Sequence, residues 1–309
     1  MPLAREPCMI RFLVLFLVLI CTETAAAETI TVGKVTRHYT VRLPDTRPAP
    51  LVIVLHGNTQ TGADMITRTD WPAVAKREGF AVAFPDGLNH AWADLRPTNL
   101  RAGRIPPHRT DDVAFIARLV EKLVADGIAD PRRVYLTGIS NGGAMTMTLI
   151  CKRADLFAAA ASVAMSLTDQ SANLCRPARP VPMLMMNGTA DPLVPFKGGR
   201  GTSRFAVDRF WPAEKTLGFW RRNNGCETRD GAVTELDDSD RGDRSTVTRI
   251  ESKCPAGRDV VLYRVNDGGH RMPGSPDARF PRLANTFLGP QNRDIDGADT
   301  IWAFFKKFP

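Results

Sequence analysis

The sequence predicts an α/β fold in which a mostly parallel central sheet has helices on both of its faces. Short apolar segments of strand length alternate along the chain with longer segments of helical periodicity, which is the order that a parallel sheet requires. The apolar segments are continuous rather than alternating, as expected for strands that are covered on both sides. Neither an internal repeat nor a linker divides the 309 residues, so we expect a single domain.

The first 27 residues have the three parts of a secretory signal peptide. Arg5 and Arg11 precede the apolar run Phe12–Cys21, and three alanines follow it. The apolar run has about half of the roughly 20 residues that a membrane span needs. The alternative to a cleaved signal peptide is an uncleaved membrane anchor. We therefore expect residues 1–27 to be removed and residues 28–309 to form the folded domain.

The first half of that domain begins with two predicted strands, Leu51–Leu55 and Phe80–Phe84, which are short apolar runs. Between them, residues 63–79 carry apolar side chains at helical spacing and end at Gly79, a helix stop signal. Asp111–Ala125 places its apolar residues along one face, which predicts an amphipathic helix.

The second half continues the alternation. A strand at Val134–Thr137 is followed by a helix at Asn141–Cys151, and a helix over 299–307 closes the chain. Further predicted strands cover residues 158–165, 181–186 and 260–265. Two polar stretches do not fit the alternation and are predicted to be surface insertions: residues 89–109 and 228–252.

The charge of the chain does not indicate a nucleic-acid partner. The formal net charge is +8, and removal of residues 1–27 leaves it unchanged because two arginines and two glutamates leave together. The basic residues are scattered without a basic run or a recognition motif. We expect an exported monomer without stable membrane association, in the periplasm or outside the cell.

Four cysteines remain after export: Cys151, Cys175, Cys226 and Cys254. An even number in an oxidising compartment predicts disulfides. Four cysteines allow three pairings, of which the nearest-neighbour one, Cys151–Cys175 with Cys226–Cys254, closes two loops of similar size. Four free buried thiols are the alternative.

A candidate nucleophile lies between a predicted strand and a predicted helix. Residues 138–142 read G-x-S-x-G, with Ser140 at the centre. This strand–turn–helix context is what the nucleophile elbow of an α/β-hydrolase requires. The flanking glycines allow the tight turn, and the helix N-terminus favours developing negative charge. Ser140 is therefore the predicted nucleophile.

A serine hydroxyl needs a base and a group that orients the base, and in this fold they follow in the order acid, then histidine. Asp191 lies in the loop after the strand 181–186, and His270 in the loop after the strand 260–265. Both loops are at carboxyl ends of strands, where open α/β sheets place their sites. Asp267 is a less suitable acid because a carboxylate three residues away does not easily reach the inner nitrogen of His270.

The predicted oxyanion hole comes from two loops. His56-Gly57 follows the strand Leu51–Leu55, in the position of the loop that supplies one backbone N–H. Asn58 is our first choice for that donor and Thr59 the second. The other donor is the N–H of Asn141, directly after the nucleophile.

With these residues in place, the chain resembles the polyhydroxybutyrate-depolymerase-like esterases of the α/β-hydrolase superfamily, a group that also includes feruloyl and acetylxylan esterases. The resemblance covers residues 39–305 and rests on L-H-G-N-T-Q, D-D-V-A-F-I, R-V-Y-L-T-G-I-S-N-G-G-A-M, N-G-T-A-D-P-L-V-P-F and G-G-H-R-M-P-G. It implies a serine esterase without metal or cofactor, and it supports Ser140, Asp191 and His270 as its catalytic residues. Asn58 and Met272 stand where the family often has Cys and Trp.

The substrate is less well defined by the sequence. The resemblance favours hydroxycinnamoyl (feruloyl-type) or other small esters, with short-chain polyester or polyhydroxybutyrate hydrolysis as the alternative. An aromatic acyl group has three candidate contacts, Trp92, Trp211 and Phe196, each of which is equally compatible with a core position. Alternatives of other classes are a serine peptidase on the same fold and a non-catalytic binding protein.

Overall fold

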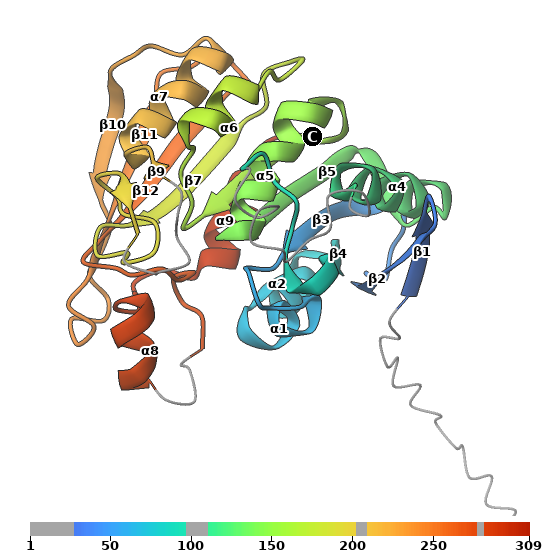
Figure 1. The fold of residues 1–309 in the computed structure, drawn as a ribbon, viewed down its shortest axis with the longest axis horizontal. Coiled ribbons are helices and arrows are strands. Elements are labelled where there is room, and N and C mark those ends of the chain that lie inside the picture. The colour runs from blue at the N-terminus through green and yellow to red at the C-terminus, as the bar shows by residue number, and fades with distance from the viewer. Residues whose placement is uncertain (1–27, 97–110, 202–208, 277–280) are drawn as a thin grey trace, which may run out of the picture.

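The computed structural model describes residues 28–96, 111–201, 209–276 and 281–309. It confirms the α/β-hydrolase architecture, with one ten-stranded sheet in the order β1-β2-β4-β3-β5-β6-β7-β12-β11-β10 (Figure 1). The strands are β1 Glu28–Val32, β2 Val35–Arg42, β3 Ala49–Leu55, β4 Ala81–Pro85, β5 Ala129–Ile139, β6 Ala159–Val163, β7 Met183–Gly188, β10 Asp230–Glu235, β11 Thr246–Ser252 and β12 Val260–Asn266. A separate two-stranded ribbon pairs β8 Gly199–Arg200 with β9 Arg209–Phe210.

The centre of the sheet is parallel and its two edges are antiparallel. The run β4-β3-β5-β6-β7-β12 is parallel throughout, whereas β1 and β2 on one side and β11 and β10 on the other are antiparallel. The loops that follow the central strands therefore all emerge at one edge of the sheet, which brings together residues that are distant in sequence.

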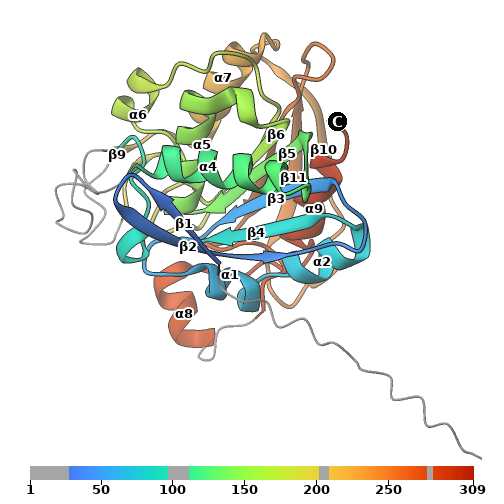
Figure 2. The same cartoon turned by 90° about the vertical axis from the view of Figure 1, so that its right-hand side faces the viewer.

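Helices cover both faces of the sheet, as predicted (Figure 2). The helices of the described segments are α1 Gly62–Arg68, α2 Trp71–Glu78, α4 Asp112–Ala125, α5 Asn141–Arg153, α6 Asp169–Leu174, α7 Ala213–Asn224, α8 Pro281–Leu288 and α9 Gly297–Phe305, with short 3₁₀ turns η1 Leu88–His90 and η2 Ala154–Leu156. Apolar side chains of α4, α5 and α7 form one buried cluster with the sheet. Those of α1, α2 and α9 form a second cluster on the opposite face.

The predicted helix over 63–79 is wrong in one respect, because the structure divides it into α1 and α2. Thr69 has an extended backbone and ends α1, and its hydroxyl donates to the carbonyl of Met65. Pro72 lies in the first turn of α2, where its missing N–H costs nothing, whereas inside one continuous helix it would break a hydrogen bond.

The predicted surface insertion over 228–252 is also corrected, since it contributes β10 and β11 to the sheet. Val247 and Ile250 of β11 are buried, so this polar segment still supplies apolar side chains to the core. Of the other predicted insertion, residues 97–109 lie outside the described residues. The part that is described does not behave as an insertion, because Trp92, Asp94 and Arg96 are all buried.

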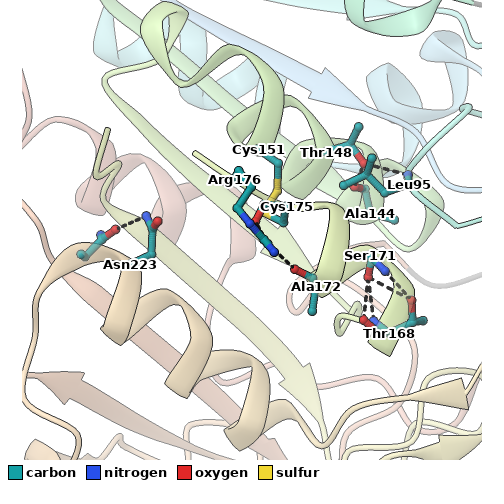
Figure 3. Close-up of a disulfide and its surroundings, with 11 residues drawn as sticks. Leu95, Ala144, Thr148, Cys151, Thr168, Ser171, Ala172, Cys175, Arg176 and Asn223 are labelled. Atoms are coloured by element: carbon teal, nitrogen blue, oxygen red, sulfur yellow. Dashed lines mark hydrogen bonds between the residues drawn. A yellow bond between two sulfur atoms is a disulfide. The ribbon is translucent and has the colours of Figure 1, made fainter. Parts of the chain in front are cut away.

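Two disulfides join these elements. Cys151 near the end of α5 pairs with Cys175 directly after α6 (Figure 3). Cys226, just after α7, pairs with Cys254, just after β11. These are the nearest-neighbour pairs. Among the helices of the described segments, none is both long and apolar enough for a membrane span. The expected signal peptide, residues 1–27, lies outside the described residues.

Candidate active site

Ser140 occupies a strained turn between β5 and α5. Its backbone angles are φ 56° and ψ −118°, a region that residues with a side chain rarely adopt and that is held only by surrounding contacts. Its N–H donates to the carbonyl of Val163 on β6, and its carbonyl accepts from Ala144 in the first turn of α5. The turn is thus fixed on both sides, and it has the form of a nucleophile elbow.

Close packing requires the two glycines of the G-x-S-x-G turn, Gly138 and Gly142. A Cβ on Gly142 would lie 2.6 Å from the carbonyl oxygen of His56, and a Cβ on Gly138 would lie 2.9 Å from Cβ of Leu55. Both distances are shorter than real Cβ contacts permit. The elbow therefore packs directly on the end of β3 and on the loop that begins with His56.

His270 and Asp191 form a buried pair. Nδ1 of His270 lies 2.7 Å from Oδ2 of Asp191, and the two side chains are 6% and 1% exposed. The other carboxylate oxygen of Asp191 accepts from the N–H groups of Leu193 and Val194, at 2.7 and 2.8 Å. Since both oxygens are engaged, the carboxylate has one orientation, and it sets the orientation of the imidazole.

The sheet explains how two loops 79 residues apart meet. Asp191 follows β7 and His270 follows β12, and these two strands are parallel neighbours. The loops pack closely at Gly188, where a Cβ would be 2.5 Å from the carbonyl oxygen of Gly269. Asp267, the rival acid, is exposed and its backbone N–H donates to Thr189. The structure thus pairs His270 with Asp191.

Three backbone N–H groups were candidates for the oxyanion hole. The N–H of Thr59 already donates to the carbonyl of His90 at 2.8 Å, so it is not available for a substrate. Within the described part of the chain, the N–H groups of Asn58 and Asn141 have no hydrogen-bond partner. Asn141 is the first residue of α5, where unsatisfied N–H groups and the helix dipole favour an anion.

His56 is buried under this loop and is held in one tautomer. Its Nδ1–H donates to the carbonyl of Gly57, and its Nε2 accepts from the N–H of Gly87. Burial lowers the pKa of His56, so the ring is neutral and can both donate and accept. His56 therefore shapes the loop that leads to Asn58, a role that sequence reasoning did not assign to it.

Sequence reasoning also missed the segment that lies against the elbow. The indole of Trp92 donates to the carbonyl of His56, and its ring centroid is 4.9 Å from the imidazole. The N–H of Ala93 donates to Asp112, a buried carboxylate that forms an ion pair with Arg37 at 2.6 Å. Asp112 stands at the start of a predicted helix and in the motif D-D-V-A-F-I, but neither signal predicted its burial or its partner.

The other aromatic candidates lie elsewhere. Trp92 is completely buried and Phe196 nearly so, so both are core residues. Trp211 is only partly buried; its indole donates to Asp169, and the ammonium of Lys215 lies 3.7 Å from its ring centroid. Met272, at the position where the family often has Trp, is buried in the cluster with α9.

Comparisons with known proteins identify the family of this chain. A family model described as Esterase PHB depolymerase matches residues 39–173. A putative esterase, NocK, of Nocardia uniformis subsp. tsuyamanensis is 31% identical over 91% of this chain and 82% of its own length. Feruloyl esterase B of Piromyces equi is 29% identical over 72% of this chain and 40% of that protein.

A solved structure agrees with the fold. The acetyl xylan esterase of Aspergillus awamori superimposes with a TM-score of 0.56 over 85% of this chain and 98% of its own, at 14% identity. With the elbow at Ser140 and the His270–Asp191 pair, these matches show that the chain belongs to the esterase PHB depolymerase family of carboxylic ester hydrolases.

Proposed function

We propose that Ser140, His270 and Asp191 form the catalytic triad of a serine esterase that works through an acyl-enzyme. The observation that carries the proposal is the buried His270–Asp191 hydrogen bond of 2.7 Å, at the sheet edge where the strained elbow presents Ser140. A carboxylate that accepts from Nδ1–H leaves Nε2 of the imidazole free to take the serine proton.

In the proposed mechanism, His270 removes the proton of Ser140 as the serine attacks the ester carbonyl. The N–H groups of Asn58 and Asn141 stabilise the oxyanion of the tetrahedral intermediate, and Asp191 stabilises the imidazolium. His270 then protonates the leaving alcohol, and a water activated by His270 releases the acid.

The proposed substrate is a hydroxycinnamoyl (feruloyl-type) or other small ester. Relatives named feruloyl esterase match along most of the chain, for example feruloyl esterase D of Neurospora crassa at 28% identity over 88% of it. Poly(3-hydroxyalkanoate) depolymerase C of Paucimonas lemoignei matches over only 38% of the chain, at 32% identity. Polyester hydrolysis is therefore the second candidate.

We further propose that the enzyme acts outside the cytoplasm as a monomer, with residues 28–309 as one catalytic domain after removal of residues 1–27. Two disulfides support export, because such bonds persist in oxidising compartments.

Labelling with a fluorophosphonate probe tests the nucleophile. The parent protein is expected to be labelled, and Ser140→Ala is expected to lose the label while keeping its thermal midpoint. Labelling that survives this substitution contradicts the assignment.

A substrate panel tests the specificity. Purified protein is expected to hydrolyse methyl ferulate faster than hydroxybutyrate oligomers, and nitrophenyl esters faster than peptide anilides. Faster turnover of the oligomers would favour the polyester alternative, and faster turnover of the anilides would favour a peptidase.

A further inference from the structure

The side-chain amide of Asn141, the residue after the nucleophile, is hydrogen-bonded through both its oxygen and its nitrogen. Its Oδ1 accepts from the N–H of Trp92 at 2.7 Å. Its Nδ2 donates to the carbonyl of Trp92 at 3.1 Å and to Oδ2 of Asp94 at 2.8 Å. The residue is buried, so these bonds are shielded from competing water.

Asp94 fixes which way the amide faces. Its carboxylate is bound by the guanidinium of Arg96, at 2.9 Å to Oδ1 and 2.6 Å to Oδ2, and accepts in addition from the N–H of Arg96. A carboxylate held in this way is an acceptor only. The NH₂ group of Asn141 must therefore face Asp94, and its oxygen must face Trp92.

Trp92 also contacts the other side of the candidate oxyanion hole. Its indole N–H donates to the carbonyl of His56, two residues before Asn58, while its backbone pairs with Asn141. One residue thus connects the two loops that carry the candidate N–H donors. The spacing of two such donors decides how well they fit an oxyanion, since they act only within about 2.7–3.1 Å of it.

The segment that carries Trp92 and Asp94 is itself anchored. The N–H of Ala93 donates to Asp112. The N–H of Leu95 donates to the hydroxyl of Thr148, about two turns beyond Asn141 on α5 (Figure 3). The hydroxyl of Thr148 also donates to the carbonyl of Ala144, so this anchor attaches the segment to α5 without a hydrogen bond to Asn141 itself. Thr148 thus holds the segment independently of the bonds that hold the side chain of Asn141.

We propose that the side chain of Asn141 is a positioning residue, which acts through Trp92 and Asp94 to set the distance between the N–H of Asn141 and the N–H of Asn58. The proposal rests on the proposed function, because it assumes that both N–H groups bind the oxyanion. It assigns to the side chain a role that is separate from that of the backbone N–H.

Two substitutions of Asn141 test the proposal. In Asn141→Asp, two carboxylates face each other and the bond to the Trp92 carbonyl is lost, so kcat for a nitrophenyl ester is expected to fall about 10²- to 10³-fold, with KM within about threefold. Asn141→Ala, which adds no charge, is expected to lose kcat without a change in KM.

The matched control is Thr148→Val, which removes one hydrogen bond between the same segment and the same helix. It is expected to lower the thermal midpoint but to keep kcat within about threefold. A second readout is the inhibition constant of a trifluoromethyl ketone, which forms a tetrahedral adduct and is expected to weaken in parallel with kcat/KM in each Asn141 variant.

Two results would overturn the proposal: Asn141→Ala that keeps parental kcat, or unchanged ketone inhibition in a variant with reduced kcat. If Asn141→Asp does not fold, Asn141→Ala and the ketone decide. Fluorophosphonate labelling of Ser140 in the parent distinguishes failure of the proposed function from failure of this proposal. Absence of labelling refutes the proposed function, whereas intact labelling with either of the two results above refutes only the role of the Asn141 side chain.

Discussion

Asp191→Asn is expected to abolish most of the esterase turnover while it preserves the fold. In the parent, one carboxylate oxygen of Asp191 accepts from the N–H groups of Leu193 and Val194, and the other faces Nδ1 of His270. An asparagine must keep its oxygen toward the two N–H donors, because the opposite orientation would place donors against donors. Its NH₂ group therefore faces His270.

This orientation determines the size of the effect. An NH₂ group that donates to Nδ1 holds the proton of the neutral imidazole on Nε2, and that tautomer cannot take the proton of Ser140. A change of this kind lowers kcat about 10⁴-fold, which corresponds to about 5 kcal/mol of barrier. The thermal midpoint is expected to change little, since the bonds to Leu193 and Val194 persist.

The assay is steady-state hydrolysis of p-nitrophenyl acetate by the purified variant, with the thermal midpoint measured in parallel. Asp267→Asn is the matched control, because it makes the same chemical change in the loop of His270. Asp267 is exposed and has a left-handed backbone, with φ 56°, which asparagine adopts readily, so its variant is expected to keep parental activity. A loss below tenfold in Asp191→Asn, or a comparable loss in Asp267→Asn, would refute the reasoning.

Three further predictions concern stability. Burial, together with the neighbouring Asp70, raises the pKa of Asp296 to about 6, above the value of about 4 that an aspartate has in an unfolded chain. The stabilisation that comes from protonated Asp296 is therefore present at low pH and is lost as the pH rises through 6. Asp296→Asn keeps an oxygen that caps the N–H of Asp299, and it is expected to raise the urea midpoint of unfolding at pH 8 but not at pH 4. An equal change in the urea midpoint at the two pH values would contradict the prediction. Burial lowers the pKa of His56, so the unfolded chain binds its proton more readily and stability is lost as the pH falls below about 6.5. In His56→Asn, urea midpoints from pH 7.5 to 5 are expected to fall less steeply than in the parent, and a parental slope would exclude His56 as a contributor. Replacing Cys226 and Cys254 by serine is expected to reduce the free energy of unfolding by about 3–4 kcal/mol without loss of kcat, which urea titration and the ester assay measure together; a loss of activity at parental stability would be the opposite result.

Much of the fold was predictable because the signals are local. The buried strand Leu51–Leu55 and the helix that begins at Asn141 follow from unbroken apolar runs and helical periodicity, and the structure contains both. The break between α1 and α2 was missed because apolar periodicity continues across Pro72, even though the backbone does not. Strand β11 was missed because it lies at the antiparallel edge, where polar residues face solvent and weaken the apolar signal.

The candidate site likewise contains residues with a local sequence signal and contacts without one. Ser140 has a motif, and Asp191 and His270 have an expected order along the chain, so sequence could select them. The contact between Asp94 and the side chain of Asn141 has no such motif, because it joins residues 47 positions apart through a loop of irregular structure. Sequence reasoning treated that loop as part of a surface insertion, since buried polar residues and solvated ones have the same composition.

The sequence by itself determined the α/β class, the family and the candidate nucleophile, acid and base, because each depends on periodicity or on a short motif in a fixed chain order. Only the tertiary structure decided that Asp191 rather than Asp267 faces His270, that Thr59 has already used its N–H, and that Trp92 is buried against His56. These outcomes depend on which loops the parallel sheet brings to one edge, and on which hydrogen-bonding groups are satisfied once the loops have packed. No single segment of the chain determines which loops meet or which of their hydrogen-bonding groups are satisfied.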